Sequence, residues 1–316
     1  MIVTYGEALV DMIEMPDGRF GAALGGAVCN FTLASARQAL AVTYLNPLSV
    51  DSFGNGFARM LDQAHVRLGS PVRSARPTSL AIVTLDENKS PSYAFHRQGV
   101  ADRDITPAQA RAALPAGVRL FHTGGLALVP EDLDATLEIV AAAAEAGALI
   151  SIDANMRPLA CDNLPAYAAG VRRALRQAHL IKVSEEDLVH LGLTAQPPLE
   201  AARTLLDLPQ VELIALTLGA DGAILLSRDA TIALPAPAGI AVRDTVGCGD
   251  CFLAGLVAAL AAQESLSAAA LADAGEETLR PALGRAIASA SLNAMREGCN
   301  PPTADEVAGF IARAEA

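Results

Sequence analysis

The most constraining feature of the sequence is a regular alternation of short apolar runs and helical patterns from residue 119 onward. The apolar runs predict strands at 119–123, 148–153, 179–183, 211–217 and 222–227. The amphipathic stretches predict helices at 131–146, 164–177 and 199–206, and later at 250–262, 281–297 and 303–314. Such alternation favours a mostly parallel sheet with helices on both faces, so the fold class is predicted to be α/β.

Polar residues follow three of these predicted strands directly. The segments are Asp153–Arg157, Lys182–Asp187 and Thr217–Gly222. Ligands of open α/β sheets bind at the carboxyl ends of the strands. We therefore expect these segments to line a binding cleft.

A glycine-rich turn precedes the predicted helix at 250–262. Gly247 and Gly249 flank Cys248, and Asp250 follows them at once. A helix start exposes free N–H groups and the positive end of the dipole, and glycine lets an anion approach that backbone closely. A carboxylate beside such a site suits a base that takes a proton from an attacking hydroxyl, as phosphoryl transfer requires. The simpler interpretation is a structural N-cap on a tight turn.

The cysteines admit a second interpretation of the same turn. The chain has five cysteines, and an odd number argues against a disulfide framework. Cys248 and Cys251 form a C-x-x-C pair at a helix start, where a thiol pKa is usually lowered, so we expect Cys248 to react with alkylating reagents. A redox pair or a zinc site is the weaker interpretation, because the glycines and Asp250 already explain the motif.

The first hundred residues predict a second, smaller sheet. Residues 2–8 form a predicted strand of the main sheet. Two alternating pairs of runs, within 9–23 and 79–97, then predict hairpins, with turns at Pro16-Asp17-Gly18 and at 86–90. Together they can make a small β-sheet lid over the cleft of a single domain spanning 1–316.

Several motifs resemble those of the ribokinase-like (PfkB) carbohydrate kinases. Asp244–Asp250 is similar to the family's D-T-x-G-A-G-D, with Cys248 in place of the alanine. Gly25–Asn30 resembles G-G-A-x-x-N, Asp153–Arg157 resembles D-x-N-x-R, and Thr217–Gly222 resembles T-x-G-x-x-G. Gly298-Cys299 is similar to the family's late Gly-Ala loop near the adenine. The resemblance spans Gly6 to Gly298 and keeps the family's order of motifs.

The resemblance implies a ribokinase-like fold, ATP and Mg²⁺ as cofactor and metal, and a role for each matching residue. Catalytic roles are implied for Asp250, Gly247, Cys248, Gly249 and Arg157. Sugar binding is implied for Asp11, Gly25, Gly26, Asn30, Phe95, Arg97 and Asn155. Nucleotide binding is implied for Ser184, Thr217, Gly219, Gly222 and Thr245. Where the family has N-x-x-E this chain has Ser184–Asp187, so an indirect metal role is expected for Asp187. A monovalent cation is left open.

The substrate is predicted to be a neutral ketohexose such as fructose. The run Phe95–Asp102 resembles the fructokinase and 2-keto-3-deoxygluconate kinase branch, and its Ala101-Asp102 ending leans toward fructokinases. Arg97 and Arg157 could bind the carboxylate of a sugar acid. However, Asp102 can neutralise Arg97, and Asp11 would repel an anion. The alternatives are 2-keto-3-deoxygluconate kinase, a nucleoside kinase such as adenosine kinase, and a catalytically silent sugar-binding protein on the same fold.

Charge and motif content exclude other functions. The net charge of −12, without a lysine or arginine cluster, argues against nucleic acid or membrane partners. No signal peptide or membrane span is evident, so a cytoplasmic protein is expected. The chain lacks G-x-x-x-x-G-K-[ST] and G-x-S-x-G motifs. Exposed edges of a small lid are rarely left bare, so a homodimer through the lid is expected.

Overall fold

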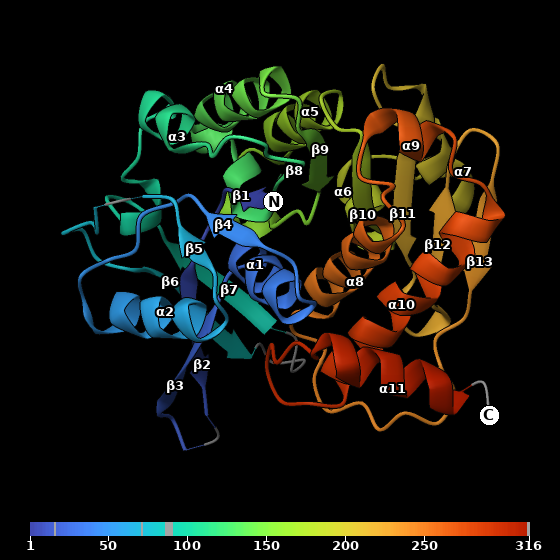
Figure 1. Ribbon diagram of the computed structural model, residues 1–316. Helices are drawn as coiled ribbons and strands as arrows, with labels where there is room; N and C mark the ends of the chain where they lie inside the picture. Colours follow the sequence, from blue (N-terminus) through green and yellow to red (C-terminus); the bar gives the residue numbers. More distant parts are fainter. Residues whose placement is uncertain (16, 71, 86–90, 315–316) are drawn as a thin grey trace.

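The computed structural model describes residues 1–15, 17–70, 72–85 and 91–314, and it contains two β-sheets (Figure 1). The strands are β1 Ile2–Thr4, β2 Leu9–Glu14, β3 Phe20–Gly25, β4 Val42–Tyr44, β5 Arg67–Leu68, β6 Ser79–Leu85, β7 Pro91–His96, β8 Leu120–Gly124, β9 Leu149–Asp153, β10 Leu180–Ser184, β11 Leu213–Thr217, β12 Ala223–Leu226 and β13 Thr231–Leu234. The α-helices are α1 Ala27–Arg37, α2 Ser52–Gln63, α3 Pro107–Ala113, α4 Pro130–Glu145, α5 Leu164–Leu175, α6 Glu185–His190, α7 Pro198–Arg203, α8 Cys248–Ala262, α9 Ala268–Ala272, α10 Glu276–Ala294 and α11 Ala304–Ala314. Short 3₁₀ turns are η1 Ala101–Arg103, η2 Gly125–Leu128, η3 Pro158–Ala160, η4 Thr204–Asp207 and η5 Gly219–Asp221.

The larger sheet has the strand order β13-β12-β11-β10-β9-β8-β1-β4-β5 in the described residues. Its strands run parallel from β5 to β11, and only β12 and β13 are antiparallel additions at one edge. The carboxyl ends of β1 and β8–β11 therefore meet at one edge of the sheet, where the polar segments of the sequence begin.

Successive residues of each central strand enter different cores, as the period of a strand requires. Leu149 packs with α1, α8 and α10 on one face, whereas its neighbour Ile150 packs with α4 and α5 on the other. Figure 1 shows these two groups of helices on either side of the sheet. A strand buried on both faces reads as a continuous apolar run, which explains why these strands were predictable.

The predicted α/β architecture is confirmed, with two local differences. The predicted strand 2–8 ends at Thr4, because Tyr5–Ala8 carry the chain out of the large sheet into β2. The helix predicted to begin at Pro281 begins at Glu276 and contains the proline. The strand β13 and the helices α3 and α9 were not predicted.

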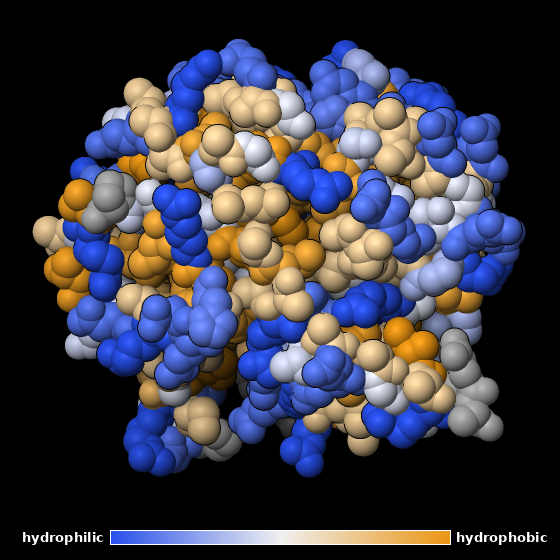
Figure 2. All heavy atoms as spheres, in the orientation of Figure 1, coloured by the Kyte–Doolittle hydropathy of each residue, from blue (hydrophilic) through white to orange (hydrophobic). Residues whose placement is uncertain are grey.

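The second sheet has the order β3-β2-β6-β7, built from the two predicted hairpins. Val10 pairs with Leu24 and Leu80, and this row packs against Phe57 of α2. The next row places Asp11 beside Ala81 on the opposite face. In Figure 2 the tip of the β2–β3 hairpin stands out from the body of the molecule. The predicted turn at 86–90 lies outside the described residues.

Candidate active site

The predicted base Asp250 lies in the first turn of α8 and contacts α1. Its Oδ2 accepts a hydrogen bond from Asn30 Nδ2 at 3.0 Å, although the two residues are far apart in sequence. Asp250 is only 7% exposed, and burial raises its pKa, while Lys182, Asn30 and Arg157 act against that rise. The structure thus places a buried carboxylate and an oriented amide side by side in the first turns of α8 and α1.

The turn before Asp250 has the backbone form expected for an anion site. Gly247 caps α8 with a left-handed φ of 74°, a conformation that glycine adopts without strain. Lys182 Nζ would lie 3.0 Å from a Cβ built on Gly249, so a side chain there would push against the lysine. Free helical N–H groups and an ammonium therefore converge on one small region.

Lys182 is a candidate functional residue that the sequence interpretation missed. It comes from β10, is 5% exposed, and forms a 3.1 Å ion pair with Asp153 at the end of β9. Burial opposes its charge, but the carboxylates of Asp153, Asp187 and Asp250 raise its pKa. Burial raises the pKa of Asp153 to about 7 despite the lysine. A single lysine inside an apolar strand was the available signal, because buried lysines are almost always paired.

Asp11, Arg157 and Tyr93 lie close enough for their charges to interact. Burial raises the pKa of Asp11 to about 6, and the positive charge of Arg157 opposes that rise. The same arginine acts on Asp250 and on Tyr93, which is also within reach of the Asp11 charge. Tyr93 was not predicted. It stacks on Phe95 with ring centroids 5.9 Å apart, so both rings share one face of β7.

The glycine pair Gly25–Gly26 permits the chain to pass close to Asp11 of β2 and to the backbone of Glu7 just before α1 begins. A Cβ on Gly25 would lie 2.8 Å from Asp11 Oδ2, and one on Gly26 would lie 2.7 Å from the Glu7 carbonyl oxygen. Gly26 also has a left-handed φ of 99°. Glu7 Oε1 accepts the Ala27 N–H at 2.9 Å and so fixes the start of α1, the helix that carries Asn30.

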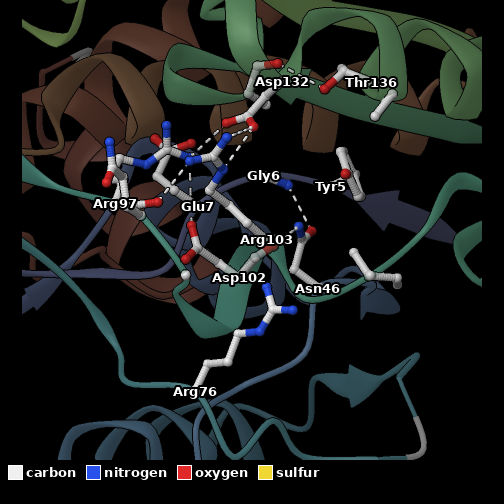
Figure 3. Close-up of a pocket in the computed structure, with 15 residues that line it drawn as sticks. Tyr5, Gly6, Glu7, Asn46, Arg76, Arg97, Asp102, Arg103, Asp132 and Thr136 are labelled. Atoms are coloured by element: carbon white, nitrogen blue, oxygen red, sulfur yellow. Dashed lines mark hydrogen bonds and ion pairs between the residues drawn. The ribbon is translucent and has the colours of Figure 1, made fainter.

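Arg97 lies in a different setting from the one predicted. It is buried, with Nη2 3.2 Å from Asp132 and 3.6 Å from Asp102, and with Nη1 donating to the Leu126 carbonyl at 3.2 Å. Figure 3 shows it among Glu7, Asp102 and Asp132. The prediction that Asp102 neutralises Arg97 is confirmed, and Asp132, far along the chain, adds a second carboxylate.

These residues line a polar cavity of about 320 Å³ beside α4. Its wall includes Tyr5, Gly6, Asn46 and Thr136, but not Asp11, Asn30, Arg157 or Asp250. Of the predicted sugar-binding residues, Arg97 alone is in this lining. The structure therefore does not bring Arg97 together with the other predicted sugar-binding residues in this cavity.

The predicted nucleotide-binding residues lie along β10–β12 and on the glycine-rich turn. Ser184 and Thr217 are cross-strand neighbours at the ends of β10 and β11. Gly219 and Gly222 have left-handed φ values of 56° and 99°, and a Cβ on Gly222 would clash with the Leu234 carbonyl at 2.2 Å. Thr245 accepts the Cys248 N–H at 3.2 Å through its carbonyl oxygen.

Asp187 is engaged by the protein on both carboxylate oxygens. Oδ1 accepts the Met156 N–H at 2.8 Å, and Oδ2 accepts the Ser184 N–H and hydroxyl at 2.8 Å each. These bonds cap α6 and hold the Asn155–Arg157 turn, where Asn155 has a left-handed φ of 34°. These bonds give Asp187 a structural role, and its indirect metal role stays a prediction.

The described residues contain no group of three or more His, Cys, Asp or Glu side chains that could hold a metal ion. Asp153 Oδ1 is a buried carboxylate oxygen without a hydrogen-bond partner, beside the Lys182 pair. A magnesium ion carried on nucleotide phosphates would find this one oxygen available.

The prediction of an activated Cys248 thiol is wrong. Burial raises the pKa of this thiol, outweighing the hydrogen bond from Asn293 Nδ2 at 3.4 Å, and the neighbouring acidic groups raise it further. The favourable field of the helix start is therefore offset by desolvation.

A buried carboxylate at a helix start, beside glycine amides and a lysine, fits phosphoryl transfer to an alcohol group. The model of the pfkB family carbohydrate kinases matches residues 1–306. The chain belongs to this family of sugar kinases, as predicted.

Several of the proteins that the chain resembles are fructokinases. The chain is 30% identical to a fructokinase of Rhizobium leguminosarum bv. trifolii over 284 residues, covering 89% of this chain and 86% of the relative. It resembles the crystal structure of a Xylella fastidiosa fructokinase with bound ATP at a TM-score of 0.88 and 28% identity, covering 100% and 99% of the two chains. A Vibrio cholerae O395 fructokinase with fructose, ADP and calcium ion bound matches at a TM-score of 0.80 and 25% identity, covering 98% of each chain. Among the described residues no helix is long and apolar enough to cross a bilayer.

Proposed function

We propose that the chain transfers the terminal phosphoryl group of ATP to a hydroxyl of fructose or a related neutral ketohexose. The observation that carries this proposal is Asp250, buried at the start of α8 and hydrogen-bonded to Asn30. The curated fructokinases and the ATP-bound and fructose-bound structures support the choice of substrates.

In this proposal Asp250 accepts the proton of the attacking hydroxyl. Asn30 holds one carboxylate oxygen and so fixes the direction in which the carboxylate faces the sugar. Burial raises the pKa of Asp250 and makes it a stronger base, whereas the charges of Lys182 and Arg157 help it to stay ionised.

The transferred phosphoryl group is held by the glycine-rich turn. N–H groups of Gly247 and Gly249 and the dipole of α8 supply positive potential, and Lys182 adds a full charge beside Gly249. The Cys248 N–H would have to be shared with the Thr245 carbonyl, which accepts it at 3.2 Å. Magnesium, when bound with ATP, would neutralise phosphate charge near Asp153 Oδ1. Ser184, Thr217, Gly219, Gly222 and Thr245 would bind the nucleotide.

The sugar would bind to the face of the second sheet that carries Asp11 and Phe95. Asp11, Asn155 and the Gly25–Gly26 amides would bind hydroxyls, with Arg157 at the mouth. Arg97 supports the cleft from behind, since Asp102 and Asp132 already pair with it. Of the two predicted arginines only Arg157 is then left to bind a carboxylate, which favours a neutral sugar over a sugar acid.

We further propose that the second sheet serves as a lid and joins two copies of the chain. Ile13, Met15 and Phe20, at the end of the β2–β3 hairpin, are 41%, 48% and 45% exposed. Apolar side chains of this size at the end of a sheet with open edges suit contact with a second lid.

The catalytic proposal is tested with Asp250→Asn. This variant should fold normally but lose about 10²- to 10⁴-fold in kcat, the usual contribution of a positioned base. Asp62→Asn, on the exposed face of α2, is the matched control. Near-normal kcat in Asp250→Asn would remove the mechanism.

The substrate is tested with kcat/KM for fructose, 2-keto-3-deoxygluconate and adenosine in one assay of ADP release. A tenfold preference for the acid would overturn the choice of a neutral sugar, and a preference for adenosine would indicate a nucleoside kinase. Binding of sugar without ADP release would indicate a catalytically silent protein.

A further inference from the structure

Four cysteines from three distant segments gather beside the anion-binding turn. Cys29 belongs to α1, Cys248 and Cys251 to α8, and Cys299 follows α10. Cys299 packs against the apolar cluster that contains Cys251, and it lies close enough to raise the pKa of Cys251, Cys29 and Cys248. The catalytic proposal assigns no role to Cys251 or Cys299.

Backbone geometry places Cys299 on the face of α8 that carries Cys251. The Cys251 N–H donates to the Gly247 carbonyl at 2.9 Å, so these residues are one helical turn apart on one face. A Cβ on Gly247 would lie only 2.3 Å from Cys299 Sγ. Cys299 therefore occupies the space that the glycine leaves open, next to Cys251.

The two thiols differ in exposure, as expected for a pair in which the more exposed cysteine reacts with an oxidant and the buried cysteine then forms a disulfide with it. Cys251 is fully buried, whereas Cys299 is partly exposed. The Cys248 sulfur is engaged elsewhere, 3.6 Å from the Ala290 carbonyl oxygen and 3.4 Å from Asn293 Nδ2, whereas Cys299 packs against the cluster that contains Cys251. The natural partner of Cys251 is thus Cys299 and not the other member of the C-x-x-C motif.

We propose that Cys251 and Cys299 form a reversible redox modification site for hydroperoxides. The Cys299 thiolate attacks the peroxide O–O bond, giving a sulfenic acid and releasing water or an alcohol. The Cys251 sulfur then attacks the Cys299 sulfur, an S–S bond forms, and the sulfenic oxygen leaves as water. A dithiol reductant restores both thiols by exchange.

The disulfide would act on the anion-binding turn. The two sulfurs must approach to about 2.05 Å to become a disulfide, which pulls residues 298–300 toward α8. That loop is tied to the turn by Gly298 N–H to Asp244 at 2.8 Å and by Asn300 N–H to Asn293 at 2.9 Å. Asn293 in turn donates to the Val246 carbonyl at 2.8 Å. Displacing the turn by about 1 Å can cost on the order of 10²-fold in rate.

The test uses the full-length chain, hydrogen peroxide and two readouts. Kinase activity is measured before and after oxidation, each variant relative to its own reduced form, and peptide mass spectrometry maps disulfides after alkylation of free thiols. Cys299→Ala and Cys251→Ser remove the pair. Cys161→Ala, at a partly exposed cysteine outside the cluster, is the control.

We expect a peptide linking 251 to 299, at least a tenfold loss of activity, and recovery with dithiothreitol in the unaltered chain and in Cys161→Ala. Both pair variants should resist inactivation. The loss of activity rests on the proposed function, but the mapped link does not. A link through Cys248, or none at all, would overturn the assignment. A formed 251–299 link with full activity would overturn its effect on the turn, and Cys299→Ala losing activity like the unaltered chain would do the same.

Discussion

Removing the amide of Asn30 should shift the pH dependence of the reaction rather than only reduce its rate. Asn30 Nδ2 donates to Asp250 Oδ2 at 3.0 Å in a buried setting. Because the hydrogen bond favours the ionised carboxylate, its loss in Asn30→Ala raises the pKa of Asp250 further above its ordinary value. A base with a higher pKa is protonated over a wider pH range.

The size of the shift follows from the kind of hydrogen bond. Bonds to charged groups contribute about 1.5–3 kcal/mol, and one pKa unit corresponds to about 1.36 kcal/mol. The acid limb of the profile should therefore move up by about one to two pH units. Activity of the variant should fall most at low pH and recover toward alkaline pH.

The assay is kcat/KM for fructose between pH 5 and 9 at constant ionic strength, because this quantity reports groups of the free enzyme. Asn55→Ala, at an exposed position in α2, is the control and should keep the original profile. A uniform drop across all pH values, without movement of the acid limb, would show that Asn30 acts on the sugar and not on Asp250.

Three further predictions follow from buried charges and from the exposed hairpin. Lys182→Met should destabilise the fold by about 3–5 kcal/mol in urea unfolding, because Asp153 loses its partner; unchanged stability would contradict this. Burial raises the pKa of Glu7 to about 7, so the contribution of Glu7 to the free energy of unfolding falls as pH rises from about 4.5 to 7. Over that window Glu7→Gln should gain up to about 3 kcal/mol in stability relative to the parent. Parallel stability–pH curves for variant and parent would contradict this. Light scattering should give twice 32.5 kDa, and Phe20→Glu should shift the mass toward the monomer; a monomeric parent at micromolar concentration would exclude the lid dimer.

Much of the fold was predictable because its signals are local. Strands such as β9 and β10 are buried on both faces, so they read as mostly apolar runs, and their bounds were predicted to within two residues. The glycine-rich turn at 247–249 was equally visible, since a left-handed φ at a helix start favours glycine. By contrast, β13 has only four residues, two of them exposed, and gave no clear period.

The rest of the site depends on contacts between residues far apart in the sequence, which local patterns do not reveal. Lys182 gains its meaning from Asp153 in the neighbouring strand, and Arg97 from Asp132 in α4. The Cys248 thiol was predicted from its helix start alone, whereas desolvation, set by the packing of α10, decides its pKa. The sequence interpretation gave Lys182 no role and misjudged the environments of Arg97 and Cys248, because such environments are set by tertiary packing.

The surroundings of Arg97 and Arg157 lead to a final prediction about substrate choice. With Arg97 held by two carboxylates, a sugar acid would depend on Arg157, whose charge is shared with Asp11 and Asp250. An ionised Asp11 repels the acid, but its pKa is raised to about 6, so protonation below that pH removes the repulsion. The ratio of kcat/KM for fructose over 2-keto-3-deoxygluconate should therefore fall severalfold from pH 8 to pH 5.5. In Asp11→Asn the ratio should hardly change with pH, because both substrates share the titration of Asp250. A parent ratio that is constant over this range would show that Asp11 does not discriminate between the two sugars.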